Sequence, residues 1–152
     1  MSDALQLSFE YTPRDQLVAF AHKTAQAKAF SPEEEKQSLA KIPAGGTCLV
    51  ELLCVAADCA NPKQLLYVLF NSTGEVIDRK KGKSHAPSKD VVGRWWTGRD
   101  QIDLPAFEES LRVRIYDERY GQTLGEYVIR PNQQPESVCC DQFQFLLHHP
   151  TP

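Results

Sequence analysis

A run of basic and aromatic side chains between residues 79 and 99 is the first group in this sequence that could bind a ligand. Seven lysines and arginines and both tryptophans of the chain fall in this interval. The candidate binding residues among them are Arg79, Lys80, Lys81, Lys83, Arg94, Trp95 and Trp96. Positive side chains beside aromatic rings can hold a phosphate group, a nucleic-acid backbone or an anionic lipid surface. The alternative is a solvated hairpin loop over residues 79–90, followed by a strand with one buried tryptophan and one at its rim.

The two adjacent tryptophans cannot play the same part. We expect a strand from Val91 to Trp96, and successive side chains of a strand point to opposite faces. At most one of Trp95 and Trp96 then enters the core. The other is exposed or covers the N-terminal helix, and an exposed indole beside Arg94 would be a strong contact point for a partner.

The five cysteines point to buried thiols rather than to a metal site. The intervals Cys48–Cys54 and Cys54–Cys59 match no zinc-finger spacing. Cys48 and Cys54 share a strand face with apolar residues, which favours buried, free thiols. An odd number of cysteines without an export signal predicts reduced thiols. The alternative, a zinc protein, would use one cysteine of the 139–140 pair with a histidine of the 148–149 pair.

Composition and motifs exclude several functional classes. The net charge of −3 argues against a strongly basic nucleic-acid-binding protein, so nucleic acid is an unlikely partner. No stretch approaches the roughly 18 apolar residues that a membrane-spanning helix needs. The first residues lack the pattern of a signal peptide, which predicts a cytoplasmic protein. We find no nucleophile elbow, zinc-protease, P-loop or dinucleotide motif. We therefore expect no enzyme, no cofactor and no metal.

The first 43 residues predict a strand and two helices. Apolar and polar residues alternate from Ala4 to Tyr11, as in a half-buried strand. Thr12 and Pro13 then have the residue types of an N-cap and a first helical position, which predicts a helix over residues 13–29. Ser31 and Glu34 have capping-box spacing, so a second short helix follows until Pro43 and the glycines behind it. We assign residues 1–43 to an N-terminal strand-helix extension. We expect it to cover an edge of the sheet, and the alternative is that it docks on a partner.

Residues 44–152 predict a β-sandwich domain. The apolar run from Leu65 to Phe70 is typical of a central strand, and the turn residues 71–74 predict a hairpin to a strand at 75–78. The other expected strands cover residues 48–55, 91–96, 101–104, 111–116, 124–130 and 138–147. Seven to nine short strands at this spacing indicate an antiparallel β-sandwich or barrel. The predicted fold is mainly β, an antiparallel β-sandwich with an N-terminal strand and one or two helices.

The order of four segments resembles a known family. LAKIPAGGTCLVELLCVAA, LLYVLFNSTGEVI, GRDQIDL and LRVRIYDERYGQTLGEY, spread over residues 39–130, are similar to the β-sandwich stress proteins of the tellurium-resistance cluster. The last segment also resembles the third loop of synaptotagmin-type calcium- and lipid-binding sandwiches. Either resemblance implies a non-enzymatic, calcium-linked binding module in a stress response or at a membrane surface.

The calcium site implied by the resemblance lacks its ligands in this chain. Lys63 stands in the stretch where the tellurium-resistance proteins cluster their carboxylates. The acids near plausible loop ends are Asp58, Asp117 and Glu118, and calcium needs six to eight oxygen ligands. We expect no high-affinity calcium site.

We therefore expect a stress-related protein–protein interaction module that works without catalysis. Its predicted contact surface is the basic segment from Arg79 to Lys89, together with Arg94 and either Trp95 or Trp96. The tip from Asp117 to Gly121, which includes Glu118, is the second candidate surface. The alternatives are a module that binds an anionic membrane or a phosphate through the same basic residues, and the zinc protein described above.

Overall fold

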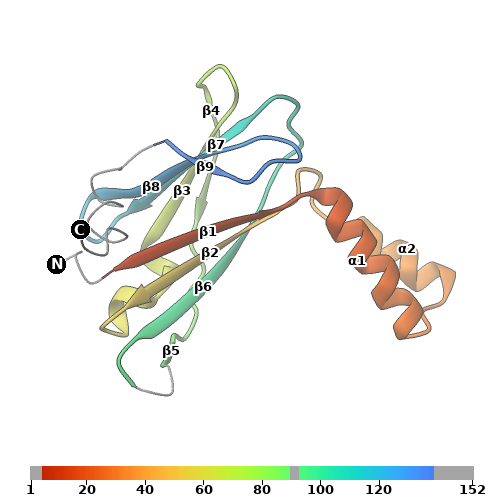
Figure 1. Cartoon of the computed structure of the whole chain (residues 1–152), viewed down its shortest axis with the longest axis horizontal. Helices are drawn as coiled ribbons and strands as arrows, with labels where there is room; N and C mark the ends of the chain where they lie inside the picture. Colours follow the sequence, from red (N-terminus) through yellow and green to blue (C-terminus); the bar gives the residue numbers. More distant parts are fainter. Residues whose placement is uncertain (1–4, 90–92, 139–152) are drawn as a thin grey trace, which may run out of the picture.

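The protein is an antiparallel β-sandwich with a helical hairpin (Figure 1). The computed structural model describes residues 5–89 and 93–138. One sheet has the order β1-β2-β6-β5 and the other the order β4-β3-β7-β8-β9. The predicted mainly-β sandwich is thereby confirmed. The expected strand from 138 to 147 lies outside the described residues except for Val138, as do Val91, Cys139, Cys140, His148 and His149.

The first sheet begins with the N-terminal strand. It consists of β1 (Gln6–Thr12), β2 (Thr47–Cys54), β5 (Ser88–Lys89) and β6 (Trp96–Asp103). β1 pairs with β2 along its whole length, and Leu5 and Leu7 enter the core. The strand that we assigned to an N-terminal extension is thus an edge strand of the sandwich itself.

The second sheet carries the predicted central strand. Its members are β3 (Leu65–Phe70), β4 (Val76–Lys81), β7 (Leu111–Asp117), β8 (Gln122–Ile129) and β9 (Glu136–Ser137). β3 lies between β4 and β7, which confirms the expectation for the apolar run. Asn71 organises the β3–β4 turn, since its Oδ1 accepts hydrogen bonds from the amides of Thr73 and Glu75.

The core lies between the two sheets. Its largest fully buried side chains include Tyr67, Leu52, Leu65, Leu69, Ile102, Leu111, Ile115, Leu124 and Ile129. Along one side the sheets are joined by Phe9 of β1 and Tyr127 of β8, whose rings stack with centroids 4.3 Å apart. The period-two pattern of these strands explains why every second side chain is buried.

The helical hairpin projects from one end of the sandwich (Figure 1). It contains α1 (Arg14–Ala27) and α2 (Pro32–Ala40). The capping box of Ser31 and Glu34 is present as predicted. Helix α1 begins one residue later than expected, because Thr12 still belongs to β1 and Pro13 takes the cap position. None of the described helices is long and apolar enough to cross a membrane.

Candidate functional site

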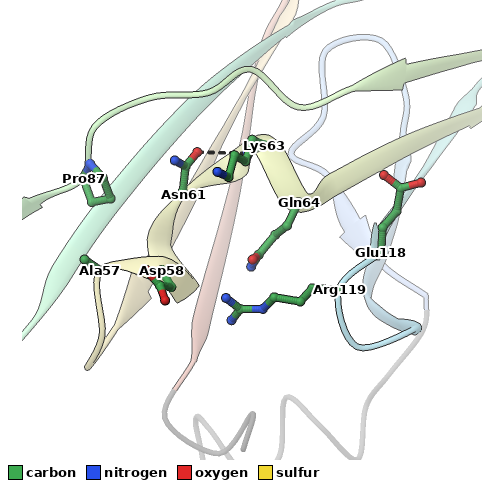
Figure 2. A pocket seen from close by; sticks show the side chains of 8 residues that line it. All are labelled: Ala57, Asp58, Asn61, Lys63, Gln64, Pro87, Glu118 and Arg119. Carbon is green, nitrogen blue, oxygen red and sulfur yellow. Dashed lines mark hydrogen bonds between the residues drawn. The ribbon is translucent and has the colours of Figure 1, made fainter.

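The loops at the opposite end of the sandwich surround a pocket, here called the loop-end pocket. Its volume is about 660 Å³, and its lining residues are Ala57, Asp58, Asn61, Lys63, Gln64, Pro87, Glu118 and Arg119 (Figure 2). They come from three connections: the one between β2 and β3, the one between β4 and β5, and the turn between β7 and β8. In Figure 2 the side chains of Gln64 and Arg119 point into the same hollow.

A disulfide fixes the first wall of the pocket. Cys54 at the end of β2 is bonded to Cys59 in the short 3-10 helix η2 (Asp58–Ala60). This corrects our expectation of free thiols at these two positions. The hydrophobic face of β2 indicated burial correctly but could not show that the chain turns back within five residues. The predicted free, buried thiol is confirmed at Cys48.

Two close backbone contacts hold the short 3-10 helices against the sheets. A Cβ on Gly98 of β6 would lie 1.6 Å from the carbonyl oxygen of Ala60, and one on Gly82 would lie 1.9 Å from that of Pro62. At both positions the neighbouring loop backbone approaches so closely that only glycine, which has no Cβ, can be accommodated. The loops that shape the pocket are consequently packed directly on the strands.

Asn61 and Gln64 connect the three parts of the pocket. Asn61 caps the second 3-10 helix, η3 (Pro62–Gln64), by accepting a hydrogen bond from the Lys63 amide at 3.0 Å. The same Oδ1 accepts from the His85 amide at 3.3 Å. The Gln64 carbonyl accepts from the Glu118 amide at 2.9 Å, and its side-chain amide donates to the Cys59 carbonyl. These bonds make the pocket a preformed feature.

Asp117 shapes the β7–β8 turn rather than offering a ligand. The side chain is 1% exposed, and its Oδ1 accepts hydrogen bonds from the amides of Arg119 and Tyr120. Of the two acids predicted at this tip, Glu118 alone is exposed and lines the pocket. It forms an ion pair with Lys81. The structure thus joins the acidic tip to one residue of the basic segment.

The basic residues do not form one loop. Arg79, Lys80 and Lys81 belong to the edge strand β4, which corrects the predicted loop over residues 79–90. The alternation that marks an exposed edge strand was obscured because consecutive charged residues occupy both faces. Lys80 is paired with Asp78 at 3.3 Å, whereas Lys83 lies in the connection that follows β4.

Lys80 and Lys83 line a smaller opening between the two sheets. This opening has a volume of about 250 Å³ and includes Tyr67 and Asp100. The Tyr67 hydroxyl donates to Asp100 Oδ2 at 2.7 Å, and the Lys83 amide donates to the same oxygen at 3.2 Å. Burial and the bond to the Asp100 carboxylate raise the pKa of Tyr67. A tyrosine that resists deprotonation is a hydrogen-bond donor within the fold, not a general base.

The tryptophans lie elsewhere than predicted. β6 begins at Trp96, and Gly93, Arg94 and Trp95 precede it in an irregular segment, so the expected strand from 91 to 96 is wrong for residues 93–95 and correct for Trp96. Trp96 packs against the core, and the Lys89 ammonium lies over its ring, 5.3 Å from the ring centre. Trp95 is half-buried and Arg94 is exposed. Neither tryptophan is therefore the freely exposed contact that we expected.

Two exposed apolar residues lie at the loop end: Tyr120, which falls within the predicted tip of residues 117–121 but was not singled out there, and Val55, which sequence reasoning missed. Tyr120 is 60% exposed and Val55 is 56% exposed. The Arg119 guanidinium lies 4.5 Å from the centre of the Tyr120 ring. The run Arg119-Tyr120-Gly121 follows the strand β7, and an aromatic residue beside glycine in a turn is the signal that could have indicated exposure.

The loop-end pocket carries both signs of charge. Asp58 and Glu118 oppose Lys63 and Arg119 among its lining residues. In the described part of the chain no group of three or more histidine, cysteine, aspartate or glutamate side chains could hold a metal ion. The pocket is therefore suited to bind a ligand that carries both positive and negative groups.

Burial raises the pKa of the Cys48 thiol, so this free cysteine is poorly suited to act as a nucleophile.

No family model, curated protein or solved structure matches this chain.

Proposed function

We propose that this protein is a non-enzymatic interaction module that binds a protein partner at its loop end. The observation that carries the proposal is the preformed, mixed-charge pocket beside an exposed Arg119–Tyr120 pair. Arginine and tyrosine are enriched among the residues that dominate binding energy at protein interfaces. A polypeptide can present positive, negative and apolar groups to such a surface, whereas a simple anion cannot.

The charge balance favours a protein over an anionic membrane or a phosphate at this end. Lys81 is paired with Glu118, Lys80 with Asp78, and Arg99 with Glu51. These pairs neutralise positive charge that would otherwise attract an anionic membrane or a phosphate. The phosphate- or membrane-binding alternative therefore relies on the remaining exposed cations, such as Arg79 and Lys83. The stress-related role implied by the family resemblance is part of the same proposal. The cytoplasmic location remains a prediction, and the Cys54–Cys59 disulfide weighs against it, because disulfides are rare in reducing compartments.

The proposal is tested by quantitative capture from a native lysate with three proteins: the wild type, Tyr120→Ala and Phe20→Ala. Phe20 is 70% exposed on α1 and provides a matched control, because it is also a solvent-exposed aromatic residue. We expect one discrete partner to be retained by the Phe20 variant and lost by the Tyr120 variant. Loss with Phe20→Ala and retention with Tyr120→Ala would move the interface to the helical hairpin and refute the proposal.

Measuring binding over a series of salt concentrations distinguishes the protein interface from the phosphate- or membrane-binding alternative. Contacts to anionic lipid or phosphate weaken steeply as salt rises, because salt screens exposed charges. Capture that persists at moderate salt supports the protein interface. Binding to anionic vesicles that disappears at the same salt concentration, and that is also lost when both Arg79 and Lys83 are changed to alanine, supports the alternative.

A further inference from the structure

A second pocket, at the end of the sandwich away from the loop-end pocket, has a different chemical character. It lies between the β3–β4 turn and the outer ends of β7 and β8, and its volume is about 330 Å³. Its lining includes Arg112 and Arg130, Ser72 and Ser110, and the glycine of the turn. No aspartate or glutamate is among the described residues that line it. We call it the Arg112–Arg130 pocket.

Arg112 is held in place before any ligand arrives. Its guanidinium lies 4.5 Å from the ring centre of Phe70, which is 7% exposed. Its Nε is buried and lies 2.9 Å from Glu126 Oε2. These two atoms meet in an ion pair, but their geometry is not that of a hydrogen bond. The terminal nitrogens carry four of the five donors of an arginine and can serve a ligand.

Two of the arginines at this face share a single carboxylate. Arg112 and Arg114 both pair with the single carboxylate of Glu126, so these three residues carry a net charge of +1. Arg130 adds a second guanidinium to the pocket, and its pair with Glu136 joins two largely exposed side chains at 2.9 Å. Exposed ion pairs contribute little free energy. An anionic ligand can therefore replace Glu136 at small cost.

The turn adds neutral groups to the two arginines. Asn71 Oδ1 accepts from the Thr73 hydroxyl as well as from backbone amides, which fixes the turn. Glu75, the acid of this turn, is bonded to the Asn71 side-chain amide at 3.0 Å. Ser72 and Ser110 also line the pocket, and a serine hydroxyl can donate a hydrogen bond to a ligand. Two forked guanidinium groups with hydroxyl donors match the oxygens of a phosphate.

We propose that the Arg112–Arg130 pocket binds a phosphate monoester. Arginine pairs recognise phosphate through bidentate, charge-assisted hydrogen bonds. A volume of about 330 Å³ is at the lower end of the range of small-ligand pockets, roughly 300–1,000 Å³, so it admits the phosphate with a small organic group. A phosphorylated side chain of a peptide and a free phosphate compound share this chemistry. The site is independent of the loop-end pocket.

The test is isothermal titration of the full chain with three probes: a glycine-flanked phosphoserine peptide with blocked termini, its unphosphorylated form, and inorganic phosphate. We expect saturable binding of the phosphopeptide and none of the unphosphorylated peptide. Tighter binding of the phosphopeptide than of inorganic phosphate identifies a phosphorylated side chain as the ligand. Equal affinity identifies free phosphate compounds. Absence of saturable binding by both phosphate probes overturns the proposal.

Three variants locate the binding. Arg130→Gln and Arg112→Lys should each weaken binding by about tenfold or more, because charge-assisted hydrogen bonds are lost. Lysine at position 112 keeps the positive charge and spares the buried Glu126, so it tests the guanidinium itself. Arg99→Gln removes an exposed, ion-paired arginine of the other sheet and should leave affinity unchanged. Equal affinity for the wild type and Arg130→Gln, or equal losses in all three variants, would refute the site.

Discussion

Lys81 at the end of β4 forms an ion pair with Glu118 in the turn between β7 and β8, 37 residues along the chain. The pair bridges from the edge strand to the rim of the loop-end pocket. It also offsets one positive charge of the basic segment. The ion pair therefore matters more for the shape and charge of the proposed interface than for the stability of the fold.

The Lys81–Glu118 pair should contribute little to stability. Both side chains are well exposed, at 60% and 41%, and exposed ion pairs contribute about 0–1 kcal/mol. A double-mutant cycle of Lys81→Met and Glu118→Gln, measured by urea denaturation, should give a coupling free energy within that range. A coupling energy well above about 1 kcal/mol would show that the pair is part of the structural frame.

Loss of the Cys54–Cys59 disulfide should destabilise the protein by about 2 kcal/mol. This magnitude follows from the loop-closure entropy of a short cross-linked loop in the unfolded chain. Cys59→Ala is the better variant because Cys54 is completely buried. The wild type in a dithiol reductant should match the variant in denaturant midpoint, and the reductant should not change the variant itself. An unchanged wild-type midpoint under reduction would contradict the disulfide. It would also be contradicted if an alkylating agent added at cell lysis modified both Cys54 and Cys59.

Gly98→Ala should destabilise the fold and disturb the pocket. The added Cβ would lie 1.6 Å from the Ala60 carbonyl oxygen, so η2 or β6 must move. Forced repacking of this kind typically costs about 1–3 kcal/mol. Gln101→Ala, at an exposed position of the same strand, is the control. Thermal denaturation of both variants measures the difference, and equal stability would mean that the close contact is absent in solution.

Stability should fall at alkaline pH because of Tyr67. Its pKa is raised in the folded state, so the unfolded chain loses this proton first as the pH passes about 10. Tyr67 therefore contributes stability that is fully present below pH 10 and is lost as the pH rises further. Tyr67→Phe should lower the free energy of unfolding at pH 7 by about 1.5–3 kcal/mol, because the hydrogen bond to Asp100 is lost.

The variant should also show a shallower alkaline decline than the wild type. Cys48 adds a decline in the same direction, since its pKa is raised as well. Urea midpoints from pH 7 to 11 should therefore be compared in a Cys48→Ala background. Parallel alkaline declines for the proteins with tyrosine and phenylalanine at position 67 would contradict the role of Tyr67.

Local patterns in the sequence predicted much of the fold. The alternation of Leu111, Val113 and Ile115 indicated β7, and the spacing of Ser31 and Glu34 indicated the start of α2. The errors occur where tertiary pairing decides the structure. Arg79–Lys81 form a strand because β3 supplies a partner along their length.

The candidate site could not be assembled from the sequence. Asn61, Pro87 and Arg119 are separated by 26 and 32 residues along the chain, and only the crossing of loops brings them around one pocket. The Cys54–Cys59 bond likewise depends on the path of the intervening loop. Periodicity reports which face a side chain occupies, but it contains no information about which loops meet at the end of a sandwich.

The most direct test of the proposed interface is photocrosslinking with p-benzoyl-phenylalanine, introduced in place of Tyr120 in one protein and in place of Phe20 in another. Both replacements exchange one exposed aromatic side chain for another, so the fold is not challenged. We predict that the partner is crosslinked from position 120 and not from position 20. Crosslinking from position 20 alone would contradict the assignment of the partner to the loop end.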